Sequence, residues 1–275
     1  MSRLVVFSDL DGTLLSHDGY DWAPARPALA ALAERGVPLV LVSSKTRSEI
    51  EAWRARLGNH HPFVSENGGA IYTPRGYFRA PLPGAAVVDG YERVELGTPA
   101  PALRAALAEL AAETGLALRG LGAMTTAEVA ARTGLPEADA ALAVRREYGE
   151  PFVAEPALDE AGAARLAAAA RRRHLRLTRG GRFWHLLAGN DKGTAARLLT
   201  AAFRTPDAPL VTLGLGDGAN DLDLLWSVDV PVIVARPDGT HAPELVAGVP
   251  GARRTRGAGP AGFTEAVLEE LAARA

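Results

Sequence analysis

Residues 3–13 read RLVVFSDLDGT, a short apolar run followed at once by two aspartates two positions apart. The run is continuously apolar rather than alternating, which is typical of a parallel strand covered on both faces. Asp9 and Asp11 therefore stand at the carboxyl end of a predicted strand, where open α/β sheets bind ligands. Paired carboxylates favour a hard divalent cation, and Mg²⁺ would leave one carboxylate oxygen as a nucleophile. An aspartate-rich turn that only caps a helix is the competing interpretation of this motif taken alone.

On both sides of this motif, apolar runs alternate with amphipathic stretches, which predicts a doubly wound α/β core with a mostly parallel sheet. Between residues 85 and 188 the alternation is less regular, so we expect an inserted α+β cap domain there, with residues 1–84 and 189–275 forming the core. In the core we expect helices at 24–35, 46–57, 192–204, 221–227 and 262–274, strands at 3–8, 37–42, 63–65, 210–215 and 231–235, and a hairpin at 70–80. In the insertion we expect helices at 99–113, 125–133, 137–147 and 159–173, and strands at 117–121, 152–154, 175–179 and 183–187.

Three further polar motifs follow predicted strands or begin predicted helices. Ser43-Ser44-Lys45 ends the second strand, where hydroxyl and backbone N–H groups bind phosphate oxygens, although serine at a helix start is also a common cap. Lys192 begins a helix, where its ammonium would pair with the nucleophile and a bound phosphate; a solvated surface lysine is the alternative. Residues 214–221 read GLGDGAND, which offers Asp217 and Asp221 as metal ligands and Asn220 as a donor to phosphate.

The glycines of this last motif also fit a dinucleotide-binding fingerprint. Gly214, Gly216 and Ala219 match its permissive form, and Asp238 follows about twenty residues later. Asp217, however, would place a carboxylate in the turn that must approach a pyrophosphate. The fingerprint also normally follows the first strand of its unit, which here carries the paired aspartates. A dinucleotide-dependent oxidoreductase is therefore the less favoured hypothesis.

Composition excludes several other classes of protein. A formal charge of −2 and a pI near 6.3 argue against nucleic-acid binding, and we find no apolar run long enough to span a membrane. Cysteine is absent, which rules out disulfides and thiolate chemistry. With no secretory signal pattern at the N-terminus, we expect a cytoplasmic protein. Glutamine is also absent and asparagine is scarce, as in many thermophiles, although a GC-rich genome explains the alanine and arginine excess equally well.

Taken together and in this order, the four motifs resemble those of the haloacid dehalogenase superfamily. The matching residues are Asp9–Thr13, Ser43, Lys192 and Gly216–Asp221. The resemblance implies that Asp9 forms an aspartyl-phosphate, that Asp11 is the general acid and base, and that Asp11 also binds Mg²⁺ through its main-chain carbonyl. It further implies that the insertion is a cap that closes over the site.

Stretches outside the four motifs are similar to the mannosyl-3-phosphoglycerate phosphatase family, which serves compatible-solute synthesis. They are SSKTR at 43–47, ENGG at 66–69, MTTAE at 124–128, REYGEPF at 146–152 and GGRF at 180–183 with His185; Gly149 stands where we expect serine. The resemblance implies a small phosphosugar substrate. On physical grounds, the planar guanidinium of Arg182 or Arg146 suits the glycerate carboxylate of such a substrate. The full set of expected substrate residues is Lys45, Arg47, Asn67, Arg146, Glu147, Glu150, Gly181, Arg182 and His185. For each of these residues in the cap domain, the alternative role is a surface ion pair or the capping of a helix end. For the whole chain, the alternatives are a phosphosugar mutase and a sugar-phosphate binding protein without catalytic activity.

Overall fold

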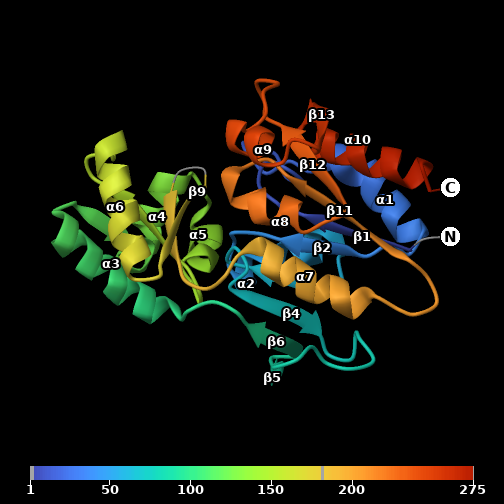
Figure 1. Ribbon diagram of the computed structural model, residues 1–275, viewed down its shortest axis with the longest axis horizontal. Coiled ribbons are helices and arrows are strands. Elements are labelled where there is room, and N and C mark those ends of the chain that lie inside the picture. Colours follow the sequence, from blue (N-terminus) through green and yellow to red (C-terminus); the bar gives the residue numbers. More distant parts are fainter. Residues whose placement is uncertain (1–2, 181–182, 275) are drawn as a thin grey trace.

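β1 (Arg3–Ser8) lies inside a large mixed sheet in this computed structural model, which describes residues 3–180 and 183–274. The described strands of the sheet follow the spatial order β13-β12-β11-β1-β2-β3-β4-β6-β5 (Figure 1). Neighbours from β13 to β3 run parallel, whereas β4, β6 and β5 pair antiparallel. The other strands are β2 (Leu39–Val42), β3 (Phe63–Ser65), β4 (Ala70–Pro74), β5 (Ala86–Val88), β6 (Tyr91–Glu95), β11 (Leu210–Gly216), β12 (Val230–Ala235) and β13 (Arg253–Ala258).

Helices cover both faces of this sheet, as the apolar sequence of β1 requires (Figure 1). Alternate residues of β1 point to opposite faces: Leu4 and Val6 belong to one apolar cluster, Val5 and Phe7 to another. The first cluster includes residues of α1 (Arg26–Glu34), α2 (Arg47–Leu57) and α10 (Gly259–Ala272), and the second includes residues of α7 (Lys192–Phe203) and α8 (Leu222–Trp226). A short helix, α9 (Pro243–Gly248), packs beside α8.

A second, antiparallel sheet occupies the middle of the chain, in the order β7-β8-β10-β9. Its strands are β7 (Leu118–Gly120), β8 (Glu150–Ala154), β9 (Arg176–Gly180) and β10 (Phe183–Leu187). α3 (Ala100–Thr114) and α6 (Glu160–Arg172) share one apolar cluster with this sheet. α4 (Thr126–Thr133) and α5 (Glu137–Ala143) share a second apolar cluster. α5 also packs against α2, a helix that covers the first sheet (Figure 1). The expected doubly wound core and inserted α+β unit are therefore confirmed.

Several expected elements differ from the structure. The hairpin predicted at 70–80 is wrong, because β4 pairs with β6 rather than with the residues just after it. β5 and β6 thus extend the first sheet, although their residues were assigned to the insertion. We therefore propose that the cap runs from about residue 96 to 188. β13 was not predicted because its arginine-rich sequence lacks an apolar run, which an edge strand does not need.

The helix predicted at 137–147 ends at Ala143, four residues early. Beyond that point the backbone N–H groups of Glu147 and Tyr148 donate to the side chain of Glu66, a residue of the β3–β4 turn. A tertiary contact has therefore replaced the last helical turn. None of the described helices is long and apolar enough to cross a lipid bilayer.

Candidate active site

Asp9 and Asp11 lie on the turn that leaves β1 at its carboxyl end, as predicted. The backbone N–H of Asp9 donates to Leu215 O of the neighbouring β11 (3.0 Å), so the first carboxylate stays in the sheet. Gly12 then turns the chain with φ of +78°. A Cβ atom at Gly12 would lie 2.4 Å from both Asp217 Oδ2 and His17 Nε2, so only glycine fits here.

Lys192, at the first turn of α7, lies between two carboxylates of the site. Its Nζ donates to Asp9 Oδ1 (2.7 Å) and to Asp221 Oδ1 (2.6 Å), and its side chain is fully buried. Burial alone would lower the pKa of Lys192, but the carboxylates of Asp221 and Asp9 outweigh it and hold the pKa above its usual value. Lys192 is therefore a charged ammonium beside Asp9, and the surface-lysine alternative is wrong.

Three buried carboxylates, those of Asp9, Asp217 and Asp221, offer ligand atoms that all lie within 4.8 Å of one another. Burial raises the pKa of Asp9 and of Asp221, with Lys192 acting against it and neighbouring aspartates adding to it. Three carboxylates thus face the single ammonium of Lys192, and a further cation would favour their ionised form. An all-oxygen, electron-rich donor set of this kind suits a hard divalent cation such as Mg²⁺. The residues present fit the predicted metal.

The side chain of Asp11 is not part of this group and contacts Lys45 instead. Lys45 Nζ lies 3.0 Å from Asp11 Oδ1 and 3.8 Å from Glu49 Oε1, and its side chain is 6% exposed. The carboxylates of Asp11 and Glu49 outweigh burial and hold the pKa of Lys45 above its usual value. The lysine therefore fixes the side chain of Asp11.

The expected phosphate-binding residues take different positions. Ser43 is buried, and its Oγ accepts from Lys45 N at 3.2 Å, whereas Ser44 lines the cavity described below. Asn220 Nδ2 donates to Asn67 Oδ1 (3.3 Å), so the two amides lie together. The amide of Asn67 itself has a buried Nδ2 with no hydrogen-bond partner among the described residues.

A cavity of about 1040 Å³ opens above these groups, with walls from both the core and the cap. Of the predicted residues, those that line it are Asp9, Asp11, Ser44, Lys45, Arg146, His185, Asp217 and Asn220. Arg146 and His185 belong to the cap sequence and face the same space as the aspartates. Burial, with Arg146 and Lys192 adding to it, lowers the pKa of His185 to about 3, so its ring is neutral.

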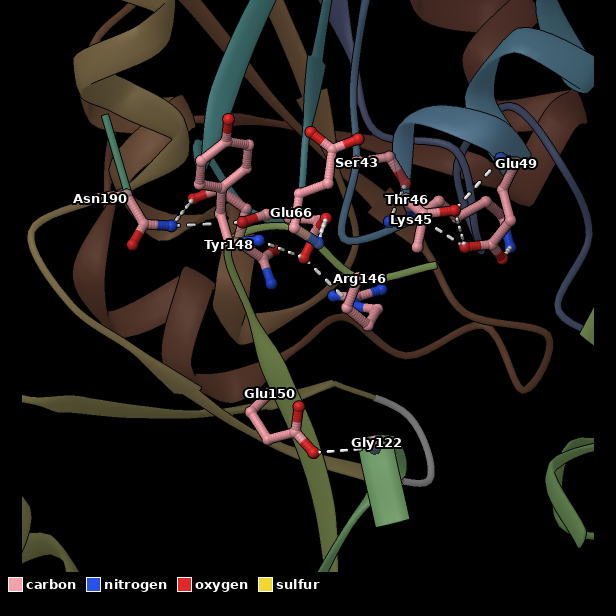
Figure 2. A network of polar contacts seen from close by, with 12 residues as sticks. Ser43, Lys45, Thr46, Glu49, Glu66, Gly122, Arg146, Tyr148, Glu150 and Asn190 are labelled. Carbon is pink, nitrogen blue, oxygen red and sulfur yellow. Dashed lines mark hydrogen bonds and ion pairs between the residues drawn. The ribbon is translucent and has the colours of Figure 1, made fainter. Parts of the chain in front are cut away.

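Four of the expected substrate residues are not among those that line this cavity: Asn67, described above, and Arg47, Glu147 and Glu150. Arg47 forms ion pairs with Glu51 (3.0 Å) and Asp89 (2.9 Å). Glu147 Oε2 accepts from Tyr72 Oη at 2.7 Å. Glu150 is buried inside the cap, where it accepts from Gly122 N at 2.8 Å (Figure 2). It also pairs with Arg104. Gly181 and Arg182 lie outside the described residues.

Sequence reasoning missed two residues of the site. No motif singled out His17, yet its Nε2 donates to Asp217 Oδ2 at 2.9 Å, and this bond raises the pKa of the ring. Glu66 appeared only within a family motif, yet its carboxylate is buried and bonded to the cap. Neither contact has a local sequence signal, because both join segments that only the fold brings together.

The geometry also removes the dinucleotide hypothesis. Backbone N–H groups of Asp217 and Gly218, which a pyrophosphate would need, both donate to Asp221 Oδ2 at 3.1 Å. Asp238, the acid expected to bind a ribose, instead accepts from Thr240 in an exposed turn. The turn after β11 is thus already filled by a carboxylate.

Comparison with known proteins shows the family of the chain. Residues 6–94 match the family model of the haloacid dehalogenase-like hydrolases. The chain is 39% identical over 96% of both chains to a protein of Methanococcoides burtonii named glucosyl-3-phosphoglycerate/mannosyl-3-phosphoglycerate phosphatase. It is 37% identical to the mannosyl-3-phosphoglycerate phosphatase of Pyrococcus furiosus, over 84% of this chain and 90% of that one. The fold is similar to the sucrose-phosphatase of Synechocystis, with a TM-score of 0.63, 16% identity, and 99% and 98% of the two chains covered.

Proposed function

Because the chain belongs to the mannosyl-3-phosphoglycerate phosphatases, within the haloacid dehalogenase-like hydrolases, we propose that it is a Mg²⁺-dependent enzyme that converts mannosyl-3-phosphoglycerate to mannosylglycerate and phosphate. Phosphosugar phosphatase activity follows from the family. The observation that supports the detailed proposal is the contact of Asp9 with Lys192 (2.7 Å) at the floor of a cavity that also contains Arg146.

In the proposed first step, a carboxylate oxygen of Asp9 attacks phosphorus in line. The new bond from Asp9 to phosphorus forms as the bond to the glycerate oxygen breaks, and Asp11 gives that oxygen a proton. In the second step Asp11 takes a proton from water, the water oxygen bonds to phosphorus, and Asp9 is released as a carboxylate. Positioning and charge supply most of the rate in such reactions, which is the role we assign to Lys192.

Asp9, Asp217 and Asp221 would hold the metal, together with the main-chain carbonyl of Asp11. When bound there, Mg²⁺ supplies positive charge that neutralises the carboxylates and the phosphate oxygens. The residues of the chain do the rest. Lys192 keeps Asp9 oriented, Lys45 holds the side chain of Asp11, and the paired amides of Asn67 and Asn220 offer donors to the phosphate.

The name of the Methanococcoides burtonii relative favours a second substrate, glucosyl-3-phosphoglycerate, which differs in the sugar alone. The glycerate end of the two substrates is the same. We therefore expect the same residues to bind both, with any preference arising from cap residues that contact the sugar.

Phosphate release tests the proposal. We expect the parent enzyme, with Mg²⁺, to hydrolyse both glycosyl-3-phosphoglycerates with a far higher kcat/KM than p-nitrophenyl phosphate, and to lose activity in a chelator. Asp9→Asn is the matched control and should release no phosphate from any of them. Equal kcat/KM for all substrates would refute the substrate assignment, and activity that requires a sugar bisphosphate would indicate a mutase instead.

A further inference from the structure

Glu66 is a buried residue of the core, and within residues 3–180 and 183–274 its carboxylate forms its hydrogen bonds and ion pair with the cap segment 146–148. Its Oε1 accepts from Glu147 N (2.7 Å) and its Oε2 from Tyr148 N (3.1 Å). Arg146 Nε lies 3.2 Å from the same Oε2 (Figure 2). The mechanism proposed above does not use this carboxylate, so its burial and its three cap partners need another explanation.

The backbone around Glu66 is held in an unusual conformation. Glu66 and Asn67 have φ of 51° and 56°, in the left-handed region that non-glycine residues seldom adopt. Asn190 Nδ2 donates to the carbonyl oxygens of both residues, at 3.2 and 3.4 Å (Figure 2). The turn is thus fixed from the core, and the Glu66 side chain projects from a rigid base.

Arg146 is the residue that the Glu66 side chain, held by this rigid turn, orients. Its side chain is 5% exposed and that of Glu66 is 1% exposed, so the pair is shielded from water. Arg146 lines the cavity, yet its Nη2 is buried without a hydrogen-bond partner among the described residues. A buried guanidinium with an unused donor is costly unless a ligand completes it.

The surroundings of Arg146 are also suited to a ligand. A Cβ atom at Gly149 would lie 3.2 Å from both Arg146 Nη2 and Glu66 Oε2, so glycine leaves room for the pair. His185, neutral and almost buried, lines the same cavity and has an unpartnered Nδ1. Two cap residues that each carry a buried polar atom without a partner therefore line the same cavity.

The other cations at or near the cavity are paired or less buried than Arg146: Arg179 is exposed and Arg236 is only partly buried. Lys45 pairs with Asp11, and Arg56 is about half exposed and lies 3.7 Å from Asp139. Lys192 is occupied by Asp9 and Asp221. Of these groups, Arg146 alone combines burial with an unused donor. A planar anion that accepts two hydrogen bonds is the ligand that a guanidinium fork recognises best.

We propose that Arg146, positioned by Glu66, binds the carboxylate of the glycerate group and thereby distinguishes carboxylated phosphosugars from neutral ones. The inference rests on the proposed function, because it assigns the substrate's second anion. The first anion, the phosphate, goes to the group around Asp9. Arg146 is then a specificity-determining residue, and Glu66 is a positioning residue that does not touch the substrate.

The test compares two ligands that differ only in this carboxylate: the product mannosylglycerate, and mannosylglycerol, in which an alcohol replaces it. Calorimetry on the whole protein measures the dissociation constant of each. For Arg146→Met we expect the affinity for mannosylglycerate to fall about 10- to 150-fold, as for loss of a charge-assisted contact. The affinity for mannosylglycerol should change at most about twofold. Arg146→Lys should recover part of the loss, because it keeps the charge without the planar fork.

Two further variants test the positioning role. Glu66→Gln keeps the shape but removes the charge that orients Arg146, and Gly149→Ala crowds the Arg146 guanidinium without deleting any polar group. Both should weaken mannosylglycerate binding selectively, by about 5- to 10-fold, since a charge-assisted bond is roughly twice as strong as a neutral one. Arg172→Lys, an exposed ion-pair arginine of α6 outside the cavity lining, is the control and should alter neither affinity.

Equal losses for both ligands in the Arg146 variants would overturn the inference, because they would show that the pair only supports the fold or the cap. Parent protein that binds mannosylglycerate no better than mannosylglycerol would overturn it as well. A failure of the proposed function would be seen in a different measurement, because the parent would then release no phosphate from mannosyl-3-phosphoglycerate.

Discussion

Asp217 accepts hydrogen bonds from two residues of the loop after β1, Thr13 Oγ1 at 3.3 Å and His17 Nε2 at 2.9 Å. The sequence predicted Asp217 as a metal ligand, because it follows a buried strand within an aspartate-rich motif. It did not predict His17, because no ligand spacing links residue 17 to residue 217. Side chains at strand ends are thus predictable from local pattern, whereas partners supplied by a loop are not.

Asp217→Asn keeps the shape of the side chain but removes its negative charge. If Asp217 helps to hold Mg²⁺, the concentration of Mg²⁺ needed for half-maximal activity should rise about tenfold or more, in line with loss of one charged ligand contact. Titration of activity with Mg²⁺ measures this. Asp238→Asn, in an exposed turn, is the matched control. An unchanged midpoint in Asp217→Asn would remove this residue from the metal group.

At the scale of elements, α2 and α4 begin with the same capping box. Thr46 Oγ1 accepts from Glu49 N at 3.2 Å, and Thr125 Oγ1 accepts from Glu128 N at 3.3 Å. Thr46-x-x-Glu49 is a capping-box pattern at the start of the helix predicted at 46–57. This helix start and the apolar parallel strands could be predicted because both signals are local. β13 and the β4–β6 pairing were not predicted, because an arginine-rich edge strand and a long-range partner leave no such pattern.

The two boxes make a matched pair of variants. Thr46→Ala and Thr125→Ala should each lower the free energy of unfolding by about 0.5–2 kcal/mol, the usual effect of losing a helix N-cap. Thr46 directly follows Lys45, which contacts Asp11, so Thr46→Ala should also reduce kcat, whereas Thr125→Ala should leave it unaltered. Denaturant titration and steady-state kinetics measure the two effects. An equal effect on kcat would contradict the link between this cap and the site.

Across the whole molecule, the cavity depends on how the cap meets the core. The sequence predicted the inserted α+β unit and several cavity residues, including Arg146 and His185. It did not predict that Arg146 would pair with Glu66, some 80 positions away, or that Arg47 and Glu150 would point elsewhere. Long-range ion pairs are set by the assembled surface of two units, and a charged residue in one segment does not identify its partner in another.

The buried His185 makes stability depend on pH. Its pKa is about 3 in the folded protein against 6.5 when exposed, so between these values the unfolded chain binds more protons. Stability should therefore fall as pH drops below about 6.5, by up to about 1.4 kcal/mol per unit. When the pH is lowered from about 7.5 to 5.5, the free energy of unfolding of the parent, measured in urea, should fall by on the order of 1 kcal/mol more than that of His185→Gln. A parent-to-variant difference that does not change with pH would contradict the buried, neutral ring.

Detection of a phosphoryl group on Asp9 tests the central claim most directly. Enzyme mixed with mannosyl-3-phosphoglycerate and Mg²⁺ is quenched in acid during turnover, digested, and analysed by mass spectrometry. We predict that the peptide with Asp9 gains the mass of one phosphoryl group, and that Asp9→Asn neither gains this mass nor releases phosphate. Phosphate release by the parent with no label on Asp9, together with turnover by Asp9→Asn, would contradict the account.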